Sequence, residues 1–333
     1  DSISRTAEAI YTTGNKNIST RWIMEQGRWR LSAAENIKAS RIEPNGISKS
    51  YGFITDIALE SAEATGLGQS VEGIELSYGI QKRTLRVKTQ EESNRMGRER
   101  GVYITFDCKG SVFTNMNASN FLTRQIARSL TELVGILKKS SPVLVVGLGN
   151  RHIVADSLGQ RSVERIKVSR FVQTGKKQSV CAFATGVLGM TGIQSAELVA
   201  GLVEKIKPSC VILIDSLATG VVSRLGKSFQ ISSCGISPGS GVGQDKERID
   251  KSILSVPTFS IGVPLLLSLR TGIYAFVKDF AKEKNWQTNE FNLRKKLADC
   301  ALADLIVAPR DIDLVVNVAS SILANAINIA FDL

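Results

Sequence analysis

Two aspartates follow apolar runs that are typical of buried β-strands. Asp156 lies shortly after the segment Pro142-Val-Leu-Val-Val-Gly-Leu-Gly149, and Asp215 ends the segment Cys210-Val-Ile-Leu-Ile-Asp215. Ligands of an open parallel sheet bind outside the carboxyl ends of its strands, so both carboxyls can face one water molecule there. We therefore expect the two side chains to lie side by side at that edge of a sheet.

Such a pair of carboxyls is suited to hydrolysis of a peptide bond. Two adjacent carboxylates do not both ionise readily, because like charges repel, so the pair shares one proton. One member then acts as a base towards water while the protonated member polarises a carbonyl group. The alternative is that Asp156 and Asp215 each cap the helix that follows, as aspartate commonly does.

Other hydrolytic and cofactor chemistries lack the residues that they need. His152 is the single histidine, so a zinc site of the HExxH type cannot be built, and no GxSxG motif supplies a nucleophilic serine. His152 also occupies the position of the third glycine in a dinucleotide fingerprint, and no Walker loop occurs. We expect no cofactor and no metal, and we interpret His152 as a loop residue near the site, with a catalytic role as the less favoured alternative.

Two glycine-rich segments are candidates for shaping the site. They are Gly186-Val-Leu-Gly-Met-Thr-Gly192, in which Thr191 could cap the next helix, and Gly235-Ile-Ser-Pro-Gly-Ser-Gly-Val-Gly243. Their bare backbone would let a substrate chain approach closely, although ordinary turns are the alternative. The residues that we expect to bind substrate or to shape the site are Gly149, Asn150, Gly189, Thr191, Gly192, Gly239, Ser240 and Gly241.

The composition is that of an ordinary globular protein with a basic surplus. The chain has 333 residues, of which 43% are hydrophobic and 22% charged, and its formal net charge is +11. The one local basic cluster, residues 82–100, also contains Glu91, Glu92 and Glu99, which favours a solvated charged face over a nucleic-acid surface. The five cysteines form no CxxC motif, so we expect a reducing cytoplasm and no disulfide framework.

Strands that alternate with helices predict an α/β fold. We expect strands at residues 82–88, 102–107, 142–149, 210–215 and 256–262, and helices at residues 121–136, 157–170, 198–206, 264–284 and 309–331. This order indicates a mainly parallel or mixed central sheet covered by helices on both faces, of a phosphorylase/hydrolase-like type. Residues 301–333 are apolar but interrupted by charges, so we expect a packing helix there and no membrane span.

The first part of the chain shows no sustained hydrophobic period. Short helical pieces are possible at residues 22–33, and the regular pattern begins at about Thr55. We therefore expect an N-terminal extension over residues 1–54 and a single α/β domain over residues 55–333.

The order and wording of these segments resemble the germination protease family. Gly147-Leu-Gly-Asn150 and Asp156-Ser-Leu-Gly159 are similar to the family's GLGN and DALG elements, and Ile214-Asp-Ser-Leu-Ala218 is similar to its IDALA element. Thr185-Gly-Val-Leu-Gly-Met-Thr-Gly-Ile193 resembles PGVMGITGI, and Gly235-Ile-Ser-Pro-Gly-Ser-Gly-Val-Gly243 resembles GIHPGSGVG. Weaker similarity reaches back to Thr55-Asp-Ile-Ala-Leu-Glu60 and forward through the last helix.

The resemblance implies an endopeptidase with a defined role. In that family the aspartates of DALG and IDALA, which fall on Asp156 and Asp215, are the proposed catalytic pair. The substrates are small acid-soluble spore proteins, degraded at germination in the cytoplasm of the forespore or spore core, and no direct nucleic-acid or membrane role is expected. The enzymes are homotetramers made as zymogens, which implies a prosegment cut here near Asp56-Ile57. The implied fold is similar to that of hydrogenase-maturation endopeptidases, which bind metal at related positions.

The sequence differs from the family pattern around both aspartates. The differing positions are Val154, Ala155, Gln160, Thr219, Gly220 and Ser237. Two other functions stay open at this point: a metal-dependent maturation endopeptidase, and a non-catalytic homologue that binds spore proteins through its basic surface.

Overall fold

A computed structural model describes most of the chain. The described residues are 6–13, 16–25, 28–37, 55–108, 111–138, 140–172, 178–237, 247–286, 293, 296–297 and 305–332. The chain divides into two compact units, residues 1–50 and residues 51–333, and each is described by itself.

The first unit contains a three-stranded antiparallel sheet. Its strands are β1 (Thr6–Thr13), β2 (Lys16–Glu25) and β3 (Arg28–Ile37), in the order β1-β2-β3. The helical pieces that the sequence suggested over residues 22–33 are therefore wrong. Antiparallel pairing of β2 with both β1 and β3 holds the three strands together.

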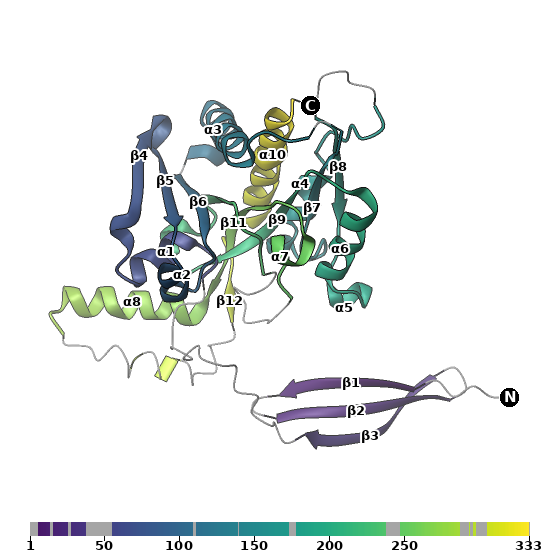
Figure 1. Ribbon diagram of the computed structural model, residues 1–333. Helices are drawn as coiled ribbons and strands as arrows, with labels where there is room; N and C mark the ends of the chain where they lie inside the picture. Colours follow the sequence, from purple (N-terminus) through teal and green to yellow (C-terminus); the bar gives the residue numbers. More distant parts are fainter. Residues whose placement is uncertain are drawn as a thin grey trace. The chain divides into compact units, whose positions relative to one another are not determined.

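The second unit is built on a mixed sheet of nine strands within the described residues (Figure 1). The order is β4-β5-β6-β10-β11-β9-β7-β8, and β12 pairs with β11. Strands β11, β9, β7 and β8 run parallel, whereas the other neighbours pair antiparallel. The strands are β4 (Val71–Leu76), β5 (Ile80–Val87), β6 (Gly101–Cys108), β7 (Val143–Gly147), β8 (Val180–Ala184), β9 (Cys210–Thr219), β10 (Ser228–Ser232), β11 (Thr258–Ser268) and β12 (Ile306–Val307).

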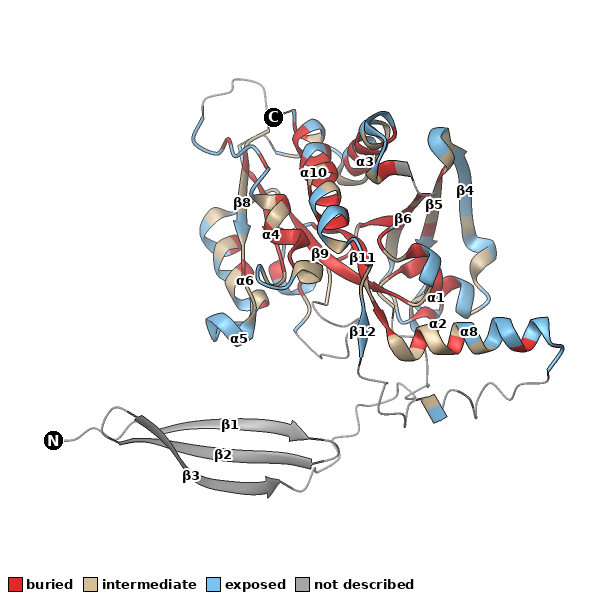
Figure 2. Cartoon of the chain, turned by 180° about the vertical axis from the view of Figure 1, so that it is seen from behind, coloured by how far each residue is buried: buried red, intermediate tan, exposed pale blue. Residues whose placement is uncertain are grey.

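Helices cover both faces of this sheet, as the sequence predicted. One apolar core joins the sheet to α3 and α10, and a second joins the opposite face to α6 and α7. Figure 2 shows the buried residues gathered on the sheet and on the sides of the helices that face it. The helices are α1 (Ala58–Ala64), α2 (Gln90–Met96), α3 (Met116–Val134), α4 (Leu158–Val163), α5 (Leu188–Thr191), α6 (Ser195–Ile206), α7 (Lys251–Leu254), α8 (Leu269–Glu283) and α10 (Ile312–Ala330).

Several predicted elements have different bounds. The helix expected over residues 264–284 is wrong at its start, because β11 continues through Pro264 to Ser268 and α8 begins only at Leu269. A register shift between Pro264 and Leu266 accommodates the missing N–H of proline, since bulges are sites where a sheet tolerates it. Strand β9 runs beyond Asp215 to Thr219, and α4 is shorter than the predicted helix over residues 157–170.

The last helix packs in the core. Among the described residues, α10 alone is long and apolar enough to cross a membrane, and 56% of its most apolar window is buried inside the protein. It packs against α3 and α4, and its fully buried side chains include Leu323 and Ile327. This burial is typical of the core helix that the sequence predicted.

Candidate active site

The candidate site begins where β7 ends beside β9. Gly147 is the last residue of β7 and pairs with Ile214, and Leu148 N then donates to Ile214 O at 2.9 Å. Beyond this level β9 continues without β7, and Asp215 is the first residue past the pairing. A loop that leaves β7 can therefore enter the space beside Asp215.

Glycines allow this loop to pack directly on the strands. A Cβ at Gly159 would lie 2.4 Å from both Ile214 O and Leu148 O, and one at Gly147 would lie 2.3 Å from Gly159 O. Real Cβ atoms do not come so close to backbone atoms, so α4 can start against β7 and β9 only because these positions are glycine.

Asp156 closes the loop on itself. It is the last residue of the 3₁₀ turn η4 (Val154–Asp156), and its Oδ2 accepts a hydrogen bond from Asn150 N at 2.8 Å. Gly149 has φ +100°, and a Cβ there would lie 2.0 Å from Asp156 O. Gln160 Nε2 donates to Gly149 O at 2.6 Å, so a residue that differs from the family pattern holds this loop in place.

Asp215 is buried within its strand. Its exposed fraction is 5%, and its Oδ1 accepts from Ser216 N at 2.8 Å. It pairs in register with Gly262 of β11, where a Cβ would lie 2.5 Å from Asp215 O. Because Asp215 lies inside a strand, the helix-capping alternative is wrong for it; α4 has Ser157 at its N-cap, without a side-chain cap hydrogen bond, so Asp156 does not cap α4 either.

The two aspartates thus belong to contacting elements at one corner of the sheet. Turn η4, which ends at Asp156, contacts both β9 and β11. Ile214, the neighbour of Asp215, accepts a hydrogen bond from Leu148 N, and the backbone of the next residue, Gly149, packs closely against Asp156. That both carboxyls reach one water molecule stays a prediction.

The other predicted site residues have mixed outcomes. Thr191 does not cap the next helix: it ends α5, its hydroxyl bonds to Val187 O and Ile193 O, and the N-cap of α6 is Gln194. Gly192, with φ +70°, is the C-cap of α5, and Gly189 has open space around it. Gly239, Ser240 and Gly241 lie outside the described residues.

A histidine mechanism and a metal site are the alternatives to the carboxylate pair. His152 is exposed, and its backbone N donates to Asn150 Oδ1 at 3.0 Å. No group of three or more His, Cys, Asp and Glu side chains that could hold a metal ion occurs among the described residues.

Residues around the predicted cleavage point lie in the folded body beside β9. Asp56 N donates to Ala218 O and Asp56 Oδ2 accepts from Ala218 N, each at 2.8 Å. Gln230 links both sides of this point, because its Nε2 donates to Asp56 O and its Oε1 accepts from Ala58 N. Ile57 is fully buried.

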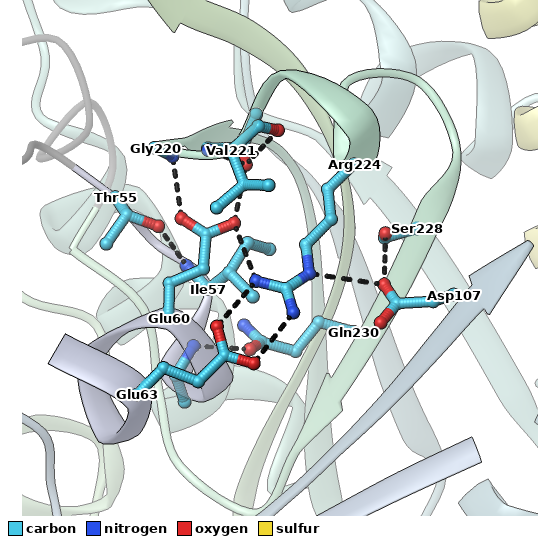
Figure 3. Close-up of polar contacts among 12 residues, drawn as sticks. Thr55, Ile57, Glu60, Glu63, Asp107, Gly220, Val221, Arg224, Ser228 and Gln230 are labelled. Atoms are coloured by element: carbon cyan, nitrogen blue, oxygen red, sulfur yellow. Dashed lines mark hydrogen bonds and ion pairs between the residues drawn. The ribbon is translucent and has the colours of Figure 1, made fainter. Parts of the chain in front are cut away.

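A buried ionic cluster, which the sequence analysis missed, holds α1 against the end of β9 (Figure 3). Glu60 accepts from Thr219 Oγ1 and from Gly220 N, each at 2.6 Å. Arg224 lies 3.4 Å from Glu60, 3.1 Å from Glu63 and 3.5 Å from Asp107. The only sequence signal was the weak similarity over residues 55–60, because the other members are scattered along the chain.

The opposite charges of this cluster stabilise one another. Burial alone would lower the pKa of Arg224, but its hydrogen bonds to Glu63 and the nearby charges of Asp107, Glu63 and Glu60 raise the pKa instead. Ser228 Oγ also donates to Asp107 Oδ1 at 2.5 Å. The cluster therefore fixes the strand end that follows Asp215.

A pocket of about 440 Å³ lies beside the same strand. Leu217 of β9 and Gly262 of β11 line one part of it, and Thr55 and Asp56 line another. Arg98 also lines the pocket and donates to Thr55 O and to Ser61 Oγ. The strand of Asp215 is thus bordered by a cavity that the segment before Ile57 helps to form.

Comparison with known proteins assigns this chain a consistent set of relatives. The family model described as germination protease matches residues 60–298. The germination protease of Caldanaerobacter subterraneus subsp. tengcongensis is 34% identical over 308 residues, covering 84% of this chain and 94% of the relative. That of Clostridium perfringens is 32% identical over 310 residues, covering 84% and 95%. That of Bacillus subtilis is 34% identical over 254 residues, covering 71% and 67%.

Among solved structures, a nickel–iron hydrogenase maturation protease, HycI, from Thermococcus kodakarensis is similar to part of the chain. It is 18% identical and covers 41% of this chain and 80% of its own, with a TM-score of 0.28. This likeness is too partial to carry an argument about chemistry.

Proposed function

Because the chain belongs to the germination protease family, we propose that it is the endopeptidase that starts the degradation of small acid-soluble spore proteins, with Asp156 and Asp215 activating water. The observation that carries this proposal is the placement of both aspartates on contacting elements at one corner of the sheet. Each carboxylate accepts one backbone N–H, which limits its rotation. Groups held in this way are suited to act on a bound peptide.

The proposed reaction needs one shared proton on the pair. The ionised carboxyl takes a proton from water as the water oxygen bonds to the peptide carbonyl carbon, and the protonated carboxyl donates a hydrogen bond to the carbonyl oxygen. The carbon–nitrogen bond then breaks as a proton passes to the leaving nitrogen. The products are a carboxylate and a protonated amine, the second proton of the water having moved to the nitrogen, and the pair again carries one proton.

The same proposal includes a prosegment that ends near Asp56. An attached segment has a high effective concentration and can hold a site closed through weak contacts. The pairing of Asp56 with Ala218, three residues after Asp215 along β9, supports this idea, because cutting the chain there would free that strand end. The buried position of Ile57 means that local opening must precede the cut.

The decisive experiment compares Asp156→Asn and Asp215→Asn with the unchanged chain on a purified small acid-soluble spore protein. Asparagine keeps the shape but cannot act as a base, so kcat falls at least about a hundredfold in each variant. His152→Ala is the matched control, because His152 is exposed on the same loop, and it keeps near-normal activity. Near-normal activity in either aspartate variant, with unchanged thermal unfolding, would remove that residue from the mechanism.

A chelator arm separates the remaining functions. Cleavage that survives the chelator supports the aspartate mechanism, cleavage lost with chelator supports a metal-dependent maturation endopeptidase, and no cleavage by the unchanged chain supports a non-catalytic binding protein. Light scattering of the same preparation measures the proposed homotetramer. The expected compartment of the protein, the spore core, is tested by fractionation of spores.

Activation is measured separately. Mass spectrometry of protein held under mildly acidic conditions identifies the new N-terminus, which we expect near Ile57. A shortened chain that begins at Ile57 is then more active than the full chain; equal activities would rule out an inhibitory prosegment.

A further inference from the structure

We infer that the outer edge of β8 is the docking strand for an extended segment of the polypeptide substrate, which adds to the sheet through main-chain hydrogen bonds beside the candidate site. This inference rests on the proposed peptidase function. Addition of a strand to an exposed sheet edge is a recurrent way of binding peptides, in which main-chain bonds supply affinity and side-chain pockets supply specificity.

The hydrogen bonds around β8 identify which of its groups face outwards. Val143 N donates to Ser179 O at 2.8 Å and Thr185 N donates to Gly147 O at 3.1 Å. Because parallel pairing alternates along a strand, residues with odd numbers in this stretch face β7. Residues with even numbers face away, as Val180 does when its carbonyl accepts from Ser169 N and its own N donates to Ser169 Oγ.

The next two outward positions have no such partner in the described part of the chain. Ala182 and Ala184 present N–H and C=O groups away from β7, and no described residue bonds to them. Both residues are partly exposed, and β8 ends the strand order of the sheet. An incoming strand can therefore reach these groups.

The two edges of the sheet differ in how they are protected. Natural sheets blunt their exposed edges with charged residues, because unpaired strands otherwise bind other chains. The opposite edge strand, β4, carries Glu72 and Glu75, both exposed. Strand β8 has the sequence VCAFA, without a charge, and among the described residues no strand pairs with its outer side.

The open edge leads to the candidate site. Strand β8 ends at Ala184, and the next residue, Thr185, bonds to Gly147 O, the residue from which the loop to Asp156 departs. A peptide paired along β8 is thus directed to the corner that holds Asp156. This continuity favours the substrate as the occupant over an unrelated partner.

Exposed apolar side chains flank the open edge at both ends. At the end near the site, Leu188, Met190 and Ile193 are 44%, 60% and 42% exposed, and at the other end Phe171 and Val172 are 89% and 61% exposed. These side chains can contact alternate side chains of an extended peptide. The substrate class that fits the edge is therefore an unfolded segment with apolar residues spaced by two.

The test removes one outward N–H at a time. Ala184→Pro and Ala182→Pro each delete a donor without touching a bond to β7, and proline is tolerated on edge strands. A fluorescent peptide that spans a cleavage site of a small acid-soluble spore protein is titrated onto each variant in an Asp156→Asn background, so that no turnover occurs. We expect Kd to rise about threefold to tenfold for each lost hydrogen bond.

Matched controls separate hydrogen bonding from bulk. Ala184→Val keeps the N–H group and adds volume, so it raises Kd less than Ala184→Pro does. Peptides in which one amide is replaced by an ester should lose affinity at every second position. An equal effect of valine and proline, no effect of proline in variants with normal thermal unfolding, or a loss without that alternation would overturn the inference.

The design also separates this inference from the proposed function. Failure of the unchanged chain to cleave the spore protein refutes the function, whereas the binding titration still decides whether the edge docks a peptide. If Ala184→Pro instead changes the oligomeric state in light scattering and leaves peptide affinity unchanged, the edge is a contact between copies of the chain and the inference is wrong.

Discussion

Replacing Arg224 by methionine should destabilise the protein, because it removes the positive charge of the ionic cluster between α1 and the end of β9. The side chain of Arg224 is 9% exposed, and that of its partner Glu60 is 5% exposed. Methionine keeps the apolar stem but removes the positive charge. Glu60 is then left in the interior without its counter-charge, and a change of this kind typically costs about 3–5 kcal/mol.

The contacts of each acid place the cost at the lower end of that range. Glu60 keeps its hydrogen bonds from Thr219 and Gly220, which still stabilise its charge. Glu63 is 45% exposed, so water solvates its carboxylate once Arg224 is gone. Its ion pair with Arg224 therefore contributes at most about 1 kcal/mol to the free energy of unfolding. We therefore expect the free energy of unfolding to fall by about 3 kcal/mol, which lowers Tm by roughly 6–12 °C for a domain of this class.

Urea and thermal unfolding measure this change against an exposed pair. Arg128 and Glu132 are 2.9 Å apart on α3, with side chains 76% and 54% exposed, so Arg128→Met should cost no more than about 0.5 kcal/mol. The double variant Glu60→Gln with Arg224→Met should recover part of the loss, because no buried charge is left unpaired. The reasoning is refuted if Arg224→Met costs no more than Arg128→Met.

Three further outcomes follow from individual contacts. Gly159→Ala should cost more than about 2 kcal/mol in urea unfolding, because its Cβ would meet backbone oxygens at 2.4 Å, whereas Gly201→Ala in open space on α6 should stabilise by up to about 1 kcal/mol; equal effects would contradict this. Asp250 caps α7, and although burial opposes its charge, hydrogen bonds from the next turn lower its pKa. A carboxyl whose pKa is lower in the folded state stabilises the fold above its unfolded pKa of about 3.9, and this stability is lost as the pH falls through the folded pKa. Asp250→Asn should therefore cost about 1 kcal/mol of unfolding free energy at pH 7 and about nothing at pH 2. A cost in urea titrations that is the same at both pH values would argue against it. Burial raises the pKa of the Cys108 and Cys210 thiols to about 12, so at pH 8 mass mapping should find neither labelled by an aromatic disulfide reagent before unfolding, and labelling of the folded protein would disprove the burial argument.

The central strands and the aspartates could be predicted because their signals are local. Continuous apolar runs at residues 143–147 and 210–214 are typical of strands buried on both faces, and those runs are fully buried here. The residues at which these strands end were harder to predict. Strand β9 continues through Ser216 to Thr219 because it pairs with β11 on one side and Asp56 bonds to Ala218 on the other, and no local pattern contains that information.

The predictions for the N-terminal strands and for the start of α8 were wrong for related reasons. Residues 22–33 have a mixed composition, and the pairing of β2 with β3 rather than local propensity decides their conformation. At Pro264 the sequence suggested a helix start, since proline favours the first turn. The parallel pairing with β9 instead carries β11 through Pro264 by a bulge, which only the tertiary structure reveals.

The ionic cluster also explains how two parts of the sequence that looked unrelated act as one unit. The segment Thr55-Asp-Ile-Ala-Leu-Glu60 and the strand end Ile214-Asp-Ser-Leu-Ala218 bind each other through Asp56 and Ala218. The residues that follow, where the resemblance leads one to expect Ala-Arg, are Thr219 and Gly220, and both donate to Glu60. An arginine is present nonetheless, since Arg224 pairs with Glu60 from the next turn. These two departures from the family pattern therefore lie where the chain has its own anchor for the strand of Asp215, and a change in Glu60 should alter the position of Asp215 more than His152→Ala does.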